Sequence, residues 1–301
     1  MPNLRDIRKR IRSVKNTGKI TRAMQLVASS KMKRAQDAAL AARPYAQMLA
    51  EMLSALPRNS NGQFLTEDAN PFLVARPVKT RGILLLSTDR GLAGALNSNL
   101  FRFIATEIKD ANAAFVAVGR KGGQFLARTN RHLIAQFSVS DRAPYREVRP
   151  IVEALTNAYR KGEIDTIEVI YPRFVNNLRQ EPTIEQLAPI PSIDCFVDTH
   201  KGRRYLTPAP NENDTREMHF EPSASAILDQ MIELYIRREI HQMILEAQAS
   251  EQSARMVAMK TATDNAHDLE RRLTLNYNKA RQAAITQELV ELSAASASAG
   301  Q

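Results

Sequence analysis

Helix breakers are missing from both ends of this 301-residue chain. Between Pro222 and Gly300 there is no glycine or proline over 77 consecutive positions, and from Asn3 to Arg43 the only such residue is Gly18. Because these two residue types interrupt helices most strongly, each interval is predicted to form one long helix. At about 1.5 Å per residue the C-terminal helix would extend about 115 Å, too far for one globular core to cover.

Cysteine and aromatic residues are also scarce. The single cysteine, Cys195, excludes an intrachain disulfide and any metal site built from several thiolates. Tryptophan is absent and aromatic residues make up 6% of the chain, so much of it is expected to be extended. No apolar run approaches the length of about 18 residues needed to span a membrane, and the start Met-Pro-Asn-Leu-Arg does not resemble a secretory signal. We expect a protein without a membrane span of its own.

Both terminal helices carry a narrow apolar stripe with steps of three and four residues, which is coiled-coil spacing. The N-terminal stripe contains Leu4, Ile7, Ile11, Val14, Gly18, Met24, Val27, Ala28, Met32, Ala35 and Ala39. The C-terminal stripe contains Ile236, Ile240, Met243, Ala247, Ala254, Val257, Leu269, Leu273, Tyr277, Ala280 and Ala284, and it is weak around Ser250, Thr261, Thr263 and Asp264. The two helices are therefore predicted to bury their stripes on each other as an antiparallel coiled coil.

The middle of the chain alternates between two patterns. Apolar runs suited to buried strands occupy 82–88, 113–119, 133–139 and 166–171, with helical patterns at 95–109, 122–129 and 145–161. Such alternation predicts a doubly wound, mostly parallel, Rossmann-like α/β domain, to which 183–187 and 193–198 could add edge strands. The predicted organisation is an N-terminal coiled-coil helix over 1–57, the α/β domain over 58–221 and a long C-terminal coiled-coil helix over 222–301.

The chain is strongly basic, with a formal charge of +10 and a pI near 9.9. Positive charge is densest in the first helix, at Arg5, Arg8, Lys9, Arg10, Arg12, Lys15 and Lys19. A field of one sign favours an acidic partner or surface. A basic helix of this kind could also neutralise nucleic-acid phosphates, but no base-reading motif accompanies it. A solvated face, or a face that meets an acidic protein, is the favoured interpretation.

The chain offers little catalytic chemistry. The loop from Ser87 to Asn97 follows a strand and contains Gly91 and Gly94, which could bring backbone amides near a phosphate. It matches neither established phosphate-binding glycine pattern, so a tight turn ordered by Asp89 and Arg90 is the favoured interpretation. The histidines lack metal-ligand spacing, and no nucleophile elbow occurs. We therefore predict no catalytic residues, no cofactor and no metal.

Three segments of the chain together resemble the gamma subunit of the rotary, proton-driven ATP synthase, its central stalk. They are 6–32, with Asn16-Thr17-Gly18-Lys19-Ile20-Thr21 at its centre; the Asp89-Arg90-Gly91-Leu92 loop that ends at Asn97; and 254–289, with Ala254-Arg255-Met256-Val257-Ala258-Met259-Lys260 at its start. The resemblance spans the chain in order. Where that family often has cysteine after Gly91-Leu92, this chain has Ala93.

The resemblance implies a non-catalytic rotor shaft. The paired helices would turn inside a ring of three alpha and three beta subunits, while the α/β domain would meet the epsilon subunit and the membrane ring of c subunits. Catalysis would belong to the beta subunits, so torque would be this chain's contribution to ATP synthesis or hydrolysis. With no presequence before Met1, the resemblance implies a bacterial complex, with this chain peripheral at the cytoplasmic face of the inner membrane.

The resemblance also implies site residues. Polar contacts to the surrounding alpha and beta subunits are expected from Met24, Lys31, Arg255, Gln282, Thr286 and Glu288. The apolar tip, expected to turn with low friction in its bearing, contains Leu289, Val290 and Leu292, and the foot toward epsilon and the c ring contains Phe220 and Glu221. Each of these could instead be an ordinary surface or seam residue.

Three other functions stay open at this point. A nucleotide-using enzyme built on the middle sheet would bind ATP or a dinucleotide as an isolated chain. A nucleic-acid binder would show duplex affinity with a steep salt dependence. A passive coiled-coil scaffold would have the same helices but would not change the turnover of a partner.

Overall fold

The structure is a computed structural model that describes residues 4–41, 45, 48–49, 70–74, 76–109, 112–190, 221 and 224–299. It divides into two compact units. One contains the chain up to Ser29 together with the chain from Arg255 onward, and the other runs from Ser30 to Ala254. The predicted domain boundaries at 57/58 and 221/222 involve residues outside the described ranges and stay predictions.

The two long helices are confirmed. Helix α1 is Leu4–Ala41 and helix α7 is Ala224–Ala299, 38 and 76 residues long. Each contributes residues to both compact units. Among the described residues, no helix combines the length and the apolar character needed to cross a membrane.

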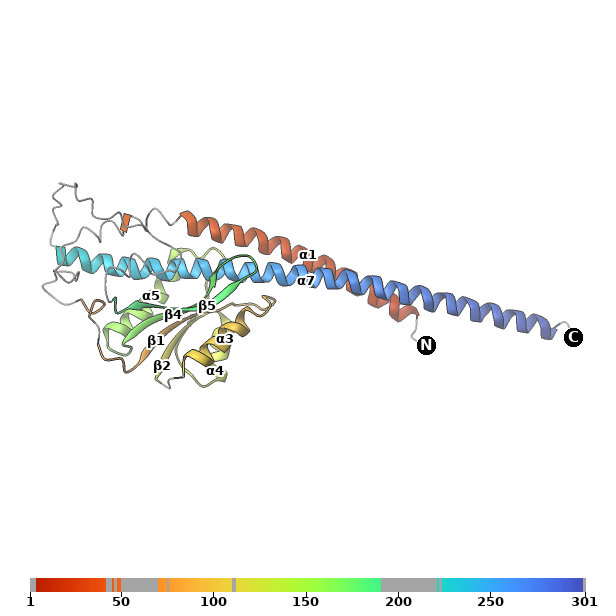
Figure 1. The fold of residues 1–301 in the computed structure, drawn as a ribbon, viewed down its shortest axis with the longest axis horizontal. Coiled ribbons are helices and arrows are strands. Elements are labelled where there is room, and N and C mark those ends of the chain that lie inside the picture. Colours follow the sequence, from red (N-terminus) through yellow and green to blue (C-terminus); the bar gives the residue numbers. More distant parts are fainter. Residues whose placement is uncertain are drawn as a thin grey trace. The chain divides into compact units, whose positions relative to one another are not determined.

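The α/β domain contains a five-stranded sheet (Figure 1). Its strands are β1 (Arg81–Leu86), β2 (Ala113–Val118), β3 (His132–Phe137), β4 (Thr166–Phe174) and β5 (Gln180–Ala188). The order is β3-β2-β1-β4-β5, parallel except for the antiparallel edge pair β4–β5. This confirms the first four predicted strands, of which β3 lies at one edge of the sheet, and the first predicted edge strand, 183–187. The second, 193–198, lies outside the described residues.

Helices cover both faces of the sheet, as a doubly wound fold requires. Alternate side chains of a strand point to opposite faces, so Ile83 and Leu85 enter a core with α3 (Leu96–Glu107) and α4 (Arg120–Arg128). Leu84 and Leu86 enter the other core, with α5 (Tyr145–Arg160) and the first part of α7. All three helices predicted between the strands are confirmed within one to two residues at most ends.

A polar staple fixes the segment that enters β1. The carboxylate of Asp165 accepts hydrogen bonds from the backbone N–H groups of Lys79 (2.8 Å) and Thr80 (2.9 Å). It also pairs with Arg76, whose Nε lies 3.0 Å away and whose guanidinium stacks on the ring of Tyr159 at 4.3 Å. This staple holds the chain on the loop between α5 and β4.

The staple predicts a pH dependence of stability. The backbone hydrogen bond from Thr80 holds the pKa of Asp165 below its ordinary value of 3.8, and the backbone hydrogen bond from Lys79 and the charge of Arg76 act in the same direction. A carboxyl whose folded pKa is depressed stabilises the fold above its unfolded pKa and loses that contribution as the pH falls through the folded value. Urea midpoints measured from neutral pH to below pH 3.8 should therefore fall more steeply in the parent than in Asp165→Asn. Parallel curves would contradict this assignment.

Candidate functional site

Contacts within the first compact unit show how the two long helices pair. Thr21 Oγ1 lies 2.7 Å from Thr263 Oγ1, and a Cβ added to Gly18 would lie 3.4 Å from the Cβ of Ala266. Lys15 Nζ lies 3.9 Å from a carboxylate oxygen of Glu270. As residue numbers fall in α1 they rise in α7, so the predicted antiparallel coiled coil is confirmed here.

The same register accounts for the rest of this seam. Counting from Gly18 and Ala266 in steps of three and four places Ile11 opposite Leu273, Ile7 opposite Tyr277 and Leu4 opposite Ala280. These side chains are all buried or half-buried. Small residues at Gly18 and Ala266 let the two backbones approach closely.

Five predicted seam residues lie elsewhere. Ile236, Ile240 and Met243 are buried in the core of the α/β unit. Val27 is 53% exposed and Leu269 is 47% exposed. Thr21 lies in the seam, where its hydroxyl pairs with Thr263. Two turns later the same face of the helix carries Ala28, which is 1% exposed, so Val27 points outward. On α7, the partly covered Glu270 faces Lys15, which leaves Leu269 about 100° around the helix from that contact.

The threonine pair was not anticipated, because the seam was expected to be weak at Thr263. Each hydroxyl also lies near a carbonyl oxygen of its own helix, Thr263 Oγ1 at 2.8 Å from Met259 and Thr21 Oγ1 at 3.1 Å from Gly18, so either threonine can donate to the other. Both threonines are buried. The pair is a polar, directional contact in an otherwise apolar seam, and it fixes the axial register of the two helices.

Replacement of both threonines tests this contact. Thr21→Val or Thr263→Val alone should destabilise the chain by about 1 kcal/mol, because the remaining hydroxyl loses its contact across the seam, while the double variant should be nearly neutral because both ends of that contact are replaced. Urea unfolding followed by far-UV circular dichroism measures the effect. Thr274→Val is the matched control, since this exposed hydroxyl bonds only the carbonyl of Glu270 in its own helix. Single effects that simply add in the double variant would show that the hydroxyls are not coupled.

The residues expected at the far end of α7 lie beyond the described part of α1 in this register. Gln282, Thr286 and Glu288 are exposed. Thr286 Oγ1 donates to the carbonyl of Gln282 (2.9 Å), one turn earlier on the same face, whereas Glu288 points about 120° away from Gln282. The structure therefore brings Gln282 and Thr286 together and separates Glu288 from them.

The apolar tip is exposed to solvent. Leu289 and Val290 are 62% and 60% exposed, and Ile285, one turn before Leu289, is 48% exposed. The side chain of Leu292 lies outside the described residues. Adjacent exposed apolar side chains of this kind indicate a surface that another protein covers.

The remaining expected contact residues have mixed environments. Met24 and Arg255 are half-buried in the first compact unit. Lys31 belongs to the second unit, where its Nζ donates to Asp141 at 2.5 Å. Together with Arg34 and Arg142, Lys31 lines a cavity of about 570 Å³. Of the foot, Glu221 is exposed and Phe220 lies outside the described residues.

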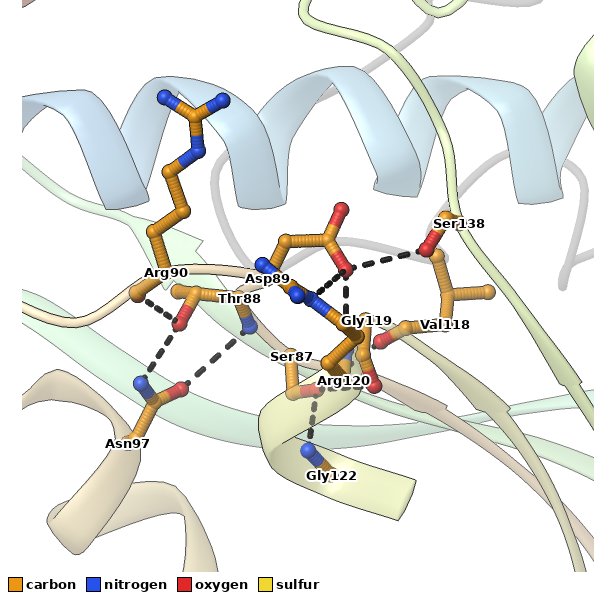
Figure 2. Close-up of polar contacts among 10 residues, drawn as sticks. All are labelled: Ser87, Thr88, Asp89, Arg90, Asn97, Val118, Gly119, Arg120, Gly122 and Ser138. Atoms are coloured by element: carbon orange, nitrogen blue, oxygen red, sulfur yellow. Dashed lines mark hydrogen bonds and ion pairs between the residues drawn. The ribbon is translucent and has the colours of Figure 1, made fainter. Parts of the chain in front are cut away.

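The loop after β1 is ordered by its own side chains (Figure 2). Ser87 Oγ donates to the carbonyl of Val118 (2.9 Å) and accepts from the N–H of Gly122 (2.8 Å). Asp89 Oδ1 accepts from the N–H of Arg120 (3.0 Å) and from the hydroxyl of Ser138 (3.1 Å). Two amides at the start of α4, where a phosphate could bind, are therefore already bonded within the chain.

The glycines in this loop differ in their roles. Gly94 has a φ of 58° and permits the turn, as expected. Gly91 has open space around its Cβ position, and Leu92 adopts the left-handed conformation (φ 63°), so the turn does not require a glycine at position 91. Asn97 holds the turn by donating to the hydroxyl of Thr88 at 2.7 Å. The geometry favours the structural interpretation of this loop over a nucleotide site.

Known proteins resemble the chain over its whole length. The family model described as ATP synthase matches residues 3–299. The ATP synthase gamma chain of Opitutus terrae is 52% identical over 295 residues, covering 98% of both chains. That of Acidithiobacillus ferrooxidans is 41% identical over 303 residues, covering 99% of both. The chain belongs to the ATP synthase gamma chain family.

Solved structures show the same fold. The rotor of the Euglena gracilis mitochondrial ATP synthase superposes with a TM-score of 0.63 at 16% identity, covering 94% of this chain and 98% of that one. The central stalk of the Tetrahymena thermophila mitochondrial enzyme superposes with a TM-score of 0.55 at 22% identity, covering 81% and 99%. At this identity the likeness concerns the fold, which agrees with the paired helices and α/β domain described above.

Proposed function

We propose that this chain is the non-catalytic central rotor shaft of a proton-translocating ATP synthase. It would transmit torque between a proton-driven c ring and the catalytic sites on the beta subunits, during ATP synthesis or hydrolysis. Membership of the gamma chain family supports this proposal. The structural observation that carries it is the antiparallel pair formed by α1 and α7, beyond which α7 continues with exposed polar and apolar side chains.

A shaft must have unequal sides to do this. It can change the nucleotide affinity of an encircling subunit only if it contacts that subunit's conformers differently. Moving such a subunit from 1:99 to 99:1 needs about 5.5 kcal/mol of differential interaction, within reach of a few charge-assisted hydrogen bonds and steric exclusion. The end of α7 is uneven in this sense, since Gln282 and Thr286 share one face and Glu288 lies on another.

The proposed partners follow from this role. Three alpha and three beta subunits would surround the helix pair and contact Met24, Arg255, Gln282, Thr286 and Glu288, with Lys31 nearer the α/β domain. Leu289, Val290 and Leu292 would turn in the bearing. Phe220 and Glu221 would lie toward the epsilon subunit and the c ring, and the chain would be peripheral at the cytoplasmic face of a bacterial inner membrane. The exposed basic side chains of α1, from Arg5 to Lys19, suit acidic loops in the surrounding ring.

Reconstitution tests the proposal. Adding the chain to alpha and beta subunits of the same organism should produce stimulated, cooperative ATP hydrolysis. Hydrolysis unchanged by the chain would instead support a passive scaffold. Isothermal titration of the isolated chain with ATP and with a dinucleotide should give no saturable heat, and saturable binding would favour an enzyme on the middle sheet. Duplex binding with a steep salt dependence would favour a nucleic-acid binder.

A further inference from the structure

Within the α/β unit, one segment of α7 has no exposed residue. From Glu239 to Ser250 none of its residues is exposed. One face is apolar and packs in the core that α7 shares with α5 and the sheet; it includes Ile236, Ile240, Met243 and Ile244. Burial of this face holds one side of the helix against the core, and hydrogen bonds, which are directional, can restrict the remaining rotation of the helix about its own axis.

A second face of this segment is polar and also buried. Glu239, Gln242, Glu246, Ser250 and Ser253 follow one another in steps of three and four, which places them in a single stripe, and each is at most 4% exposed. Buried polar groups are costly unless they are hydrogen-bonded, and Ser253 at the end of this stripe makes such a bond to another part of the domain.

On one side, α7 is bonded to the loop between β3 and α5. Gln248 Nε2 donates to the carbonyl oxygen of Ser140 at 2.8 Å. His241 Nε2 lies 2.9 Å from the carbonyl oxygen of Ala143, and because a carbonyl only accepts, this nitrogen carries the proton. The two side chains are seven residues apart and share one helix face.

This loop is itself held in place. Ala143 is buried in the left-handed conformation (φ 40°), and its N–H donates to the carbonyl of Ser140 at 2.9 Å. The N–H of Ser140 donates to Glu147 at 2.7 Å, and that backbone hydrogen bond lowers the pKa of the Glu147 carboxyl. Asp141 accepts from Lys31 of α1 at 2.5 Å. The loop therefore connects both long helices to the sheet.

On another side, α7 is bonded to the turn of the β4–β5 hairpin. Ser253 Oγ donates to the carbonyl oxygen of Asn177 at 2.9 Å. The turn is fixed by Asn176 Oδ1, which accepts from the N–H groups of Leu178 (2.9 Å) and Arg179 (2.8 Å). Ser253 follows Gln248 by five residues, so the two bonds leave the helix about 140° apart.

We propose that the β3–α5 loop and the hairpin turn form a two-sided clamp that prevents α7 from turning within the α/β domain. Gln248, His241 and Ser253 are the positioning residues of the clamp, through which torque passes between domain and helix. Their acceptors are backbone carbonyls on two separate, internally bonded loops, and hydrogen bonds weaken steeply when misaligned. Rotation of α7 by one residue step would break all three bonds together. This inference rests on the proposed rotor function and adds where the torque enters the shaft.

Single-molecule rotation of the assembled alpha, beta and gamma complex tests the clamp. A probe attached at Lys109→Cys, with Cys195 replaced, would report the α/β domain while the beta subunits are fixed to a surface. The double variant Gln248→Met, Ser253→Ala removes two of the three side-chain bonds. If the three bear the load equally, the angular variance of the probe during catalytic pauses should rise by up to about threefold, with hydrolysis by the soluble complex little changed.

Matched variants separate a clamp from a merely structural role. Gln248→Lys keeps a donor for Ser140 and should restore the parent variance, which Gln248→Met should not. Gln124→Met with Thr106→Ala, at exposed positions of α4 and α3, should leave the variance unchanged. If the double variant fails to assemble, the angular variances of the single variants Gln248→Met and Gln248→Lys decide between a clamp and a merely structural role.

The outcomes are distinct. A parent complex that rotates, with the same variance in the double variant, would overturn the clamp alone. A parent complex that does not rotate would overturn the proposed function, and the torque role of the clamp with it.

Discussion

Replacing Glu168 with alanine is expected to destabilise the α/β domain by about 3 kcal/mol. Glu168 is 7% exposed near the start of β4 and accepts two hydrogen bonds from Arg81 of β1, at 3.0 Å and 2.5 Å. Breaking a buried pair by removing one partner costs about 3–5 kcal/mol because the remaining charge is left in a poorly solvated site. The Arg81 side chain is 24% exposed and can recover some hydration, which favours the lower end.

Urea unfolding followed by far-UV circular dichroism measures this loss, with Glu153→Ala as the matched control. Glu153 pairs with Arg149 four residues earlier on the exposed face of α5, and such pairs contribute about 0.3–0.5 kcal/mol. Glu168→Gln keeps the shape and one acceptor and should fall between the two. Equal effects for the two alanine variants would show that the β1–β4 pair is no more important than a surface pair.

Replacing Gly18 with leucine is expected to separate α1 from α7 and to abolish the stimulation of ATP hydrolysis. A single Cβ at Gly18 would already touch Ala266, so a leucine side chain has no space unless the helices move apart. Overpacking of this kind costs about 1–3 kcal/mol locally. Separation would also strain the adjacent hydroxyl pair of Thr21 and Thr263, and a widened shaft would no longer fit a closed ring.

Spin labels at the exposed positions Thr17 and His267 would measure the helix separation by electron–electron distance. The parent should give a single short distance, and Gly18→Leu a longer or broader distribution. Lys19→Leu adds the same side chain at an exposed neighbouring position and serves as the control. An unchanged distance and normal stimulation in Gly18→Leu would contradict the close approach at this point.

The α/β domain could be predicted well because its strands are buried on both faces. The run Gly82-Ile83-Leu84-Leu85-Leu86 contains no polar position, as expected for a central parallel strand. The three interstrand helices followed from the spacing between such runs. Strand β3 was harder, since burial alternates along it at the edge of the sheet.

The helix pairing was predicted, but its register was not. Apolar periodicity identifies a seam, yet it treats Thr21 and Thr263 as weak points and Val27 and Leu269 as members. The structure reverses this because a hydroxyl pair is satisfied inside the seam and the register it fixes turns both apolar residues outward. Which polar residues find a partner across two helices depends on their relative position, which a single sequence does not give.

The clamp on α7 was missed for a related reason. Glu239, Gln242, Glu246 and Ser250 are polar at helical spacing, which in sequence is typical of a solvated face. They are buried in the folded α/β unit, where the hairpin turn and the β3–α5 loop, far away in the chain, bond Ser253 and Gln248 of the same helix. Backbone carbonyls supply the acceptors, and no side-chain pattern in the sequence marks them.

The most direct test of the rotor account is a reversible cross-link at the end of α7. With Cys195 replaced, Glu288→Cys would be joined by a disulfide to a cysteine placed on the facing loop of a beta subunit in the assembled complex. The account predicts that ATP hydrolysis is lost as the cross-link forms and returns when the disulfide is reduced. Hydrolysis that continues unchanged in the fully cross-linked complex would contradict a shaft that must turn within its ring.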